Sequence, residues 1–181
     1  MQLPIHLIAS SIDADLYHFE LAHKQPRVAY IQRKAACIDP LLRILGARNS
    51  AYTERIRWQP LADLREEEYA AEIRAASIFL NLSTAEGFPT SCVEAMASGT
   101  VVAGFDGVGG RDLLRHGENC ILAPTGDYVT LAYTLAPLLD NLLNGGAAAW
   151  KELRENGFKT AAPLTAESET RSLVQFWQSV L

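Results

Sequence analysis

The sequence predicts a doubly wound α/β domain built on a parallel sheet, and three observations predict it. Short apolar segments alternate along the chain with segments of helical character. The apolar segments are hydrophobic throughout rather than at every second residue, as in strands that are buried on both faces. The chain of 181 residues, 49% hydrophobic and 20% charged, has ordinary globular composition and is long enough for one core.

The first part of the chain leads into a strand and a helix. An apolar run at 3–10 is compatible with a strand or with a docking segment, and the polar, irregular residues 11–26 are typical of a loop. Residues 27–31 predict a buried strand. A helical pattern follows at 40–45, and Gly46 is expected to end that helix.

The middle of the chain continues this alternation. Residues 54–58 alternate like a strand that ends before Pro60. A helix with an acidic first turn is predicted at 65–76, and an apolar strand at 77–83. A loop that contains glycine and proline follows at 84–90.

The last part of the chain adds two strands and several helices. A short helix at 91–98 is expected to end at Gly99, and buried strands are predicted at 100–105 and 120–124. The remaining residues are predicted to form three helices, at 128–143, 147–157 and 167–181.

Charge, cysteine content and hydropathy exclude several classes of protein. The net charge of −5, from 16 basic and 21 acidic residues, argues against nucleic acid or an anionic membrane as the main partner. The three cysteines, Cys37, Cys92 and Cys120, form no paired framework, which favours a reducing compartment. No apolar stretch is long enough for an integral membrane segment. We therefore expect a cytoplasmic protein.

The loop at 84–90 carries the strongest chemical signal. It lies at the carboxyl end of a predicted strand and opens a helix, where unpaired amides and the helix dipole attract anions. Gly87 allows close backbone approach, and Pro89 stiffens the loop. Glu86 and Glu94 flank this anion site, and their carboxylates are suited to gripping sugar hydroxyls.

Structural alternatives exist for each of these charged residues. Ser91-x-x-Glu94 has the spacing of a capping box, and Glu86 could be a solvated loop residue. Arg33 and Lys34 follow the first predicted strand, so they could neutralise a pyrophosphate at the same sheet edge. The alternative for this pair is a solvated entrance to the next helix.

No metal site or bound cofactor is predicted. Asp13-Ala14-Asp15 has the form of a metal-holding triplet, but it lies in a loop without a preceding strand and indicates turn and helix-cap chemistry. The histidines show no ligand spacing. They are His6, His18, His23 and His116.

Residues 86–99, EGFPTSCVEAMASG, resemble the E-x7-E signature of the retaining family 4, or group 1, glycosyltransferases. The resemblance continues in the right order over most of the chain and is weakest after about residue 145. Its further parts are 12–13, 27–30, 33–34, 100–103, 109–110, 117–119 and 123–127.

This resemblance implies a GT-B enzyme, in which two Rossmann-like domains face each other across a cleft. Residues 1–181 are similar to a single Rossmann-like donor-binding domain, the C-terminal half of such an enzyme. In it, 1–26 would lead into the domain and about 165–181 would form a closing helix. By this resemblance, the N-terminal acceptor domain would lie outside residues 1–181, in the same or a separate chain.

The resemblance also implies a role for each candidate residue. The catalytic residues would be Glu86, Arg33 and Lys34. The two cations would stabilise the leaving pyrophosphate, so that no metal is needed. Glu94 would bind the ribose hydroxyls, and the base would lie near 58–61. The loop that holds the donor hexose and distal phosphate would consist of Gly87, Phe88, Pro89 and Thr90.

The donor would be a nucleotide sugar, linked to UDP or GDP. Asp39 stands where the family usually has its lysine, so Lys34 would have to replace that group. The first hypothesis is a hexosyltransferase domain that is inactive alone. The alternatives are the donor subunit of a two-chain glycosyltransferase and a non-catalytic nucleotide-sugar binding module.

Overall fold

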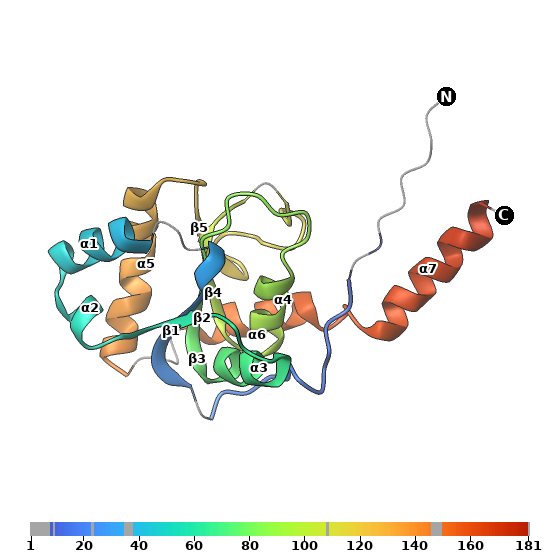
Figure 1. Ribbon diagram of the computed structural model, residues 1–181, viewed down its shortest axis with the longest axis horizontal. Coiled ribbons are helices and arrows are strands. Elements are labelled where there is room, and N and C mark those ends of the chain that lie inside the picture. Colours follow the sequence, from blue (N-terminus) through green and yellow to red (C-terminus); the bar gives the residue numbers. More distant parts are fainter. Residues whose placement is uncertain are drawn as a thin grey trace.

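The computed structural model describes residues 8, 10–22, 24–34, 38–107, 109–145 and 150–180. Five parallel strands form one sheet in the order β2-β1-β3-β4-β5 (Figure 1). The strands are β1 Gln25–Ile31, β2 Arg57–Leu61, β3 Ala76–Asn81, β4 Val101–Phe105 and β5 Cys120–Ala123.

Helices cover both faces of this sheet, so the predicted doubly wound α/β architecture is confirmed. One face packs against α1, α2 and α5, at the left of Figure 1, and the other against α3, α4 and α6. The helices are α1 Ile38–Arg48, α2 Ala51–Glu54, α3 Glu66–Ala75, α4 Thr90–Ala97, α5 Tyr128–Leu143, α6 Lys151–Ala161 and α7 Ala166–Val180.

The strand order determines where a ligand can bind. The chain winds outward in one direction from β1 to β2 and in the other from β3 to β5. Adjacent loops therefore leave the carboxyl ends of β1 and β3 toward opposite faces of the sheet. In open α/β sheets this switch point is where a crevice forms and ligands bind.

Burial explains the sequence pattern of the central strands. Every residue of β3 and of β4 is buried, because helices cover both sides. β2 lies at the edge of the sheet, and it contains Pro60 opposite Tyr30 of β1. A proline is tolerated there because an edge strand needs only one row of hydrogen bonds.

Several predicted element ends differ from the structure. Helix α1 continues through Gly46 to Arg48, since Leu41 and Leu45 anchor it in the core and an interior glycine costs only about 1 kcal/mol. The strand predicted at 54–58 begins at Arg57, because the preceding residues form the short helix α2. It also continues through Pro60 to Leu61, since an edge strand pairs along one side only.

Several sequence predictions concern residues beyond the described ranges. These are most of the apolar run at 3–10, the start of the helix predicted at 147–157, Cys37, His6 and His23. Cys92 and Cys120 are buried and free.

Helix α7 is the one described helix of more than eight residues that buries none of its residues, and it projects away from the core (Figure 1). The side chain of Ser11 donates a hydrogen bond of 2.5 Å to Glu169 in its first turn, and the amide of Ser11 donates one of 3.0 Å. The start of the domain is thus tied to the start of this helix. In the described ranges no helix has the length and apolarity needed to cross a membrane.

Candidate functional site

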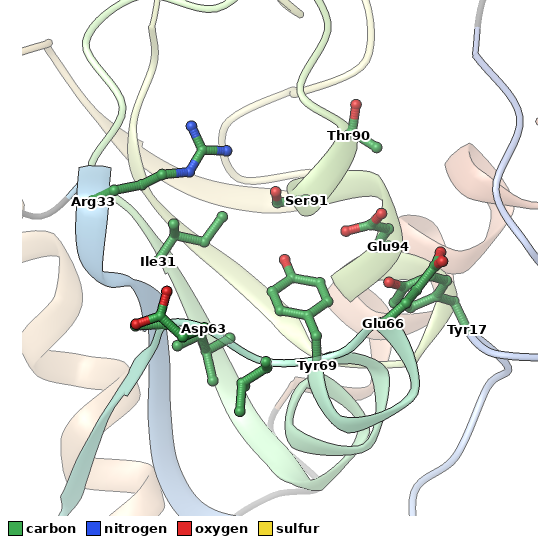
Figure 2. Close-up of a pocket in the computed structure, with 12 residues that line it drawn as sticks. Tyr17, Ile31, Arg33, Asp63, Glu66, Tyr69, Thr90, Ser91 and Glu94 are labelled. Carbon is green, nitrogen blue, oxygen red and sulfur yellow. The ribbon is translucent and has the colours of Figure 1, made fainter.

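A pocket of about 620 Å³ opens at the carboxyl ends of β1 and β2, between α3 and α4 (Figure 2). It lies at the switch point of the sheet, where the topology leads us to expect a ligand. Its lining residues are Tyr17, Ile31, Arg33, Leu61, Ala62, Asp63, Leu64, Glu66, Tyr69, Thr90, Ser91 and Glu94.

Two cations stand at the end of β1. Arg33 and Lys34 form a 3-10 turn at Gln32–Lys34, directly after the strand. The Lys34 ammonium makes an ion pair with Glu86, so the loops that follow β1 and β3 are joined by charge. Burial lowers the pKa of Lys34, and the neighbouring Arg33 lowers it further. Both effects disfavour the charged ammonium form of Lys34. A bound anion would favour that form again.

The start of α4 forms the upper wall of the pocket. The helix begins at Thr90 with Pro89 in the N-cap position, and no side chain caps it. Ser91 therefore lies inside the first turn, so the capping-box interpretation of Ser91-x-x-Glu94 is wrong. Glu94 is free of that structural role. Among the first amides of α4, Thr90 donates to the carbonyl of Phe88 and Cys92 to that of Pro89, whereas the Ser91 amide has no acceptor within the described residues.

Glu94 lies one turn further along α4 and points into the pocket in Figure 2. Burial raises the pKa of its carboxyl to about 7, and the nearby charge of Glu66 raises it further. The Tyr69 hydroxyl and Lys34 oppose this shift by favouring the carboxylate. The carboxyl therefore changes charge near neutral pH while it lines the pocket.

Tyr69 rises from α3 between Ser91 and Glu94 (Figure 2). Its buried hydroxyl makes no hydrogen bond of good geometry in the described residues, although Ser91 and Glu94 lie near enough to influence it. Burial raises the pKa of this hydroxyl above its usual range. The hydroxyl thus remains a neutral donor in the floor of the pocket.

Gly109 and Gly110 hold the loop that carries Glu86. A Cβ atom on Gly109 would collide with the backbone carbonyl of Glu86, and one on Gly110 with the ring of Pro89 at 2.5 Å. Gly110 also has a positive φ of 83°. The two glycines therefore allow the backbone of this turn to lie directly against the Glu86 loop.

The predicted turn at Asp13 is confirmed. Its carboxylate accepts hydrogen bonds from the amides of Asp15 at 2.9 Å and Leu16 at 3.3 Å. Among the described residues, no three histidine, cysteine, aspartate or glutamate side chains are grouped so as to hold a metal ion.

Residues 23–141 match the family model described as "Glycosyl transferases group 1". The match extends over more than half of the chain. The protein belongs to the group 1 glycosyltransferases.

Solved glycosyltransferases share the fold of this group 1 domain. Sucrose-phosphate synthase from Thermosynechococcus elongatus has a TM-score of 0.73 at 19% identity, over 96% of this chain and 52% of that one. Anabaena HepE in complex with UDP has a TM-score of 0.68 at 14% identity, over 93% and 56%. The chain thus spans about half the length of these two proteins. No curated protein sequence matches it.

A third structure covers only a domain. The C-terminal domain of a group 1 glycosyl transferase from Francisella tularensis has a TM-score of 0.61 at 14% identity, over 84% of this chain and 97% of that one. The expected resemblance to the C-terminal domain of a GT-B glycosyltransferase is thus confirmed at the level of the fold.

The structure brings the predicted site residues of this group 1 domain to one edge of the sheet. Arg33, Thr90 and Glu94 line the pocket, and Lys34 and Glu86 form their ion pair beside it. The other predicted residues, Gly87, Phe88 and Pro89, form the loop between Glu86 and α4.

Only part of the region predicted to hold the nucleotide base, residues 58–61, lies at the pocket. Leu61 lines the pocket, whereas the indole of Trp58 donates a hydrogen bond of 2.9 Å to the carbonyl of Tyr52 and serves the core. Four polar pocket residues have no counterpart in the sequence predictions, since they come from loops and helices outside the motif. They are Tyr17, Asp63, Glu66 and Tyr69.

Proposed function

We propose that this domain binds a nucleotide-diphospho-sugar and forms the donor half of a retaining hexosyltransferase. The observation that carries the proposal is that one pocket is lined by groups that attract an anion and by a carboxyl that can accept hydrogen bonds from hydroxyls. Arg33 offers positive charge and the start of α4 offers the Ser91 amide, while the half-buried carboxyl of Glu94 faces the same space. A nucleotide sugar has both an anionic diphosphate and hydroxyls.

Each group has a role in this proposal. Arg33 and Lys34 stabilise the negative charge that develops on the leaving diphosphate, which is electrostatic catalysis that needs no metal. Glu86 and the backbone of residues 87–90 hold the donor hexose and its phosphate. Glu94 accepts hydrogen bonds from the ribose hydroxyls. The donor is UDP- or GDP-linked.

In this proposal, transfer of the sugar requires a second domain that binds the acceptor. The pocket lies on one domain, and the acceptor would be bound by an N-terminal domain in the same or a separate chain. The chain's span of about half of two related structures supports this. The domain alone would then bind donor but transfer little sugar.

Calorimetric titration tests the proposed donor binding. The purified chain is titrated with UDP, GDP and their glucose or mannose conjugates, beside Glu94→Gln and the control Glu155→Gln, an α6 carboxylate that does not line the pocket. We expect one nucleotide to bind and Glu94→Gln to weaken that binding about tenfold, as expected when a charged hydrogen-bond acceptor is lost. The control should bind like the unmodified chain. Absence of binding to every nucleotide would overturn the proposal.

A further inference from the structure

Asp63 has an unusual backbone. Its φ of 53° makes it the one non-glycine residue with a positive φ among the residues that the structure describes. It lies between the end of β2 and the start of α3 and lines the pocket. Residues held in such sparsely populated conformations gather at ligand sites, where the conformation serves to aim a side chain.

The carboxylate of Asp63 is not used by the protein itself. Within the described ranges it makes no hydrogen bond and no ion pair, although aspartates in left-handed turns often bond to their own backbone. Its α3 neighbour Arg65 pairs instead with Glu68. Asp63 is exposed at the rim of the pocket, so its carboxylate is accessible to a ligand there.

The pocket wall around Asp63 is apolar. Ile31, Leu61, Ala62 and Leu64 line this side, and in Figure 2 Ile31 lies between Arg33 and Asp63. If the diphosphate lies at Arg33, the flat faces of the base fit against these aliphatic side chains. Asp63 is then the charged side chain that meets the edge of the base.

We infer that the donor carries guanine, and that the Asp63 carboxylate accepts hydrogen bonds from N1–H and N2–H of that base. This inference rests on the proposed nucleotide-sugar function. Guanine presents two adjacent donors, which match the two oxygens of a carboxylate. Uracil presents a single N–H between two carbonyl oxygens, and those oxygens would face the negative charge of Asp63.

The test is a titration of the chain with GDP and UDP, beside Asp63→Asn. Asparagine tolerates the left-handed region as aspartate does, so the backbone is kept. Its carbonyl can accept from N3–H of uracil while its amino group donates to a uracil oxygen. We expect the unmodified chain to bind GDP at least tenfold more tightly than UDP, and Asp63→Asn to lose about tenfold for GDP while gaining for UDP.

Two further variants keep the result interpretable. Glu67→Gln, an exposed carboxylate on α3 that does not line the pocket, should leave the ratio of GDP to UDP affinity unchanged. Asp63→Gly removes the carboxylate and suits the positive φ, so it should melt no lower than the unmodified chain and lose the preference for GDP.

The outcomes separate this inference from the proposed function. Tighter binding of UDP than of GDP, or an unchanged affinity ratio in Asp63→Asn, would overturn the guanine assignment and leave donor binding intact. Binding of neither nucleotide would overturn both.

Discussion

The two ends of the sheet each hold a half-buried ionisable side chain, but these side chains serve different purposes. At the carboxyl end, burial raises the pKa of Glu94 to about 7, and the carboxyl faces a pocket of about 620 Å³. At the amino end, burial and then Arg154 lower the pKa of Lys24 to about 7. The Lys24 ammonium donates to the carbonyl of Ser98 at 3.0 Å and to the hydroxyl of Thr100 at 2.6 Å.

This comparison shows that a shifted pKa does not by itself identify a functional group. Both groups titrate near neutrality because they are desolvated. Lys24 directly precedes β1, and its hydrogen bonds hold the start of this strand to the turn before β4. Its charge therefore stabilises the fold. Glu94 borders open space, so its charge is available to a ligand. Access to a cavity separates the two cases.

The largest expected effect comes from removing both cations at the carboxyl end. Arg33→Gln combined with Lys34→Gln should weaken binding of the nucleoside diphosphate about 100- to 1000-fold, since two charge-assisted contacts to phosphate are lost. Calorimetry measures the change. Lys24→Gln, at the amino end, should leave the affinity within about twofold. Equal losses in both variants would mean that the two ends do not differ in function.

The amino end can be tested by replacing its buried guanidinium. Arg154 is 4% exposed, it stacks on Trp150, and its Nε and one Nη have no hydrogen-bond partner in the described residues. Arg154→Met should raise the free energy of unfolding by about 1 to 3 kcal/mol, because an incompletely paired buried charge is replaced by an apolar chain of similar length. Urea unfolding measures this. Donor affinity should not change. A large loss of stability would contradict the interpretation that this guanidinium is incompletely paired.

The pH dependence of stability tests Glu94. Its folded pKa is raised from 4.5 to about 7, so the native state holds more protons between these values and loses stability as pH rises through 7. Glu94→Gln should therefore be more stable than the unmodified chain by about 1 to 2 kcal/mol at pH 8, with a smaller difference at pH 5. Thermal or urea unfolding at both pH values measures it. A difference that does not vary with pH would show that Glu94 titrates normally.

The smallest expected effect concerns the ion pair between Lys34 and Glu86. A diphosphate must compete with Glu86 for the Lys34 ammonium, so Glu86→Gln should bind the free nucleoside diphosphate about threefold more tightly. The same variant should lose the additional affinity for the sugar conjugate. Parallel titrations with GDP and GDP-mannose measure both. Weaker binding of the free diphosphate would show that Glu86 does not compete.

The sequence predicts this fold well because its signals are local. The helix at 128–143 is found at α5 Tyr128–Leu143, with Asp127 at the N-cap accepting a hydrogen bond from the amide of Thr130. The apolar runs at 27–31, 77–83, 100–105 and 120–124 correspond to parallel strands, and two of these strands, β3 and β4, are buried throughout. Helix and strand ends were less certain, as at Gly46, where packing of Leu41 and Leu45 outweighs the propensity of one residue.

The site could be predicted only in part. The loop at 84–90 and the cations after β1 were recognised from their position beside predicted strands. Asp63 and Tyr69 were not, since the β2–α3 connection brings them to the pocket from outside the motif and neither has a distinctive spacing. A positive φ at an aspartate is visible only in the folded backbone.

Pro60 at the open edge of β2 has a consequence for how the protein behaves in concentrated solution. An exposed parallel edge offers a row of amides and carbonyls to any extended peptide, and that row is a common starting point for aggregation. Proline has no amide hydrogen to offer, so an additional strand could not form a continuous ladder along β2. The same proline thus protects this edge of the sheet from pairing with a further strand.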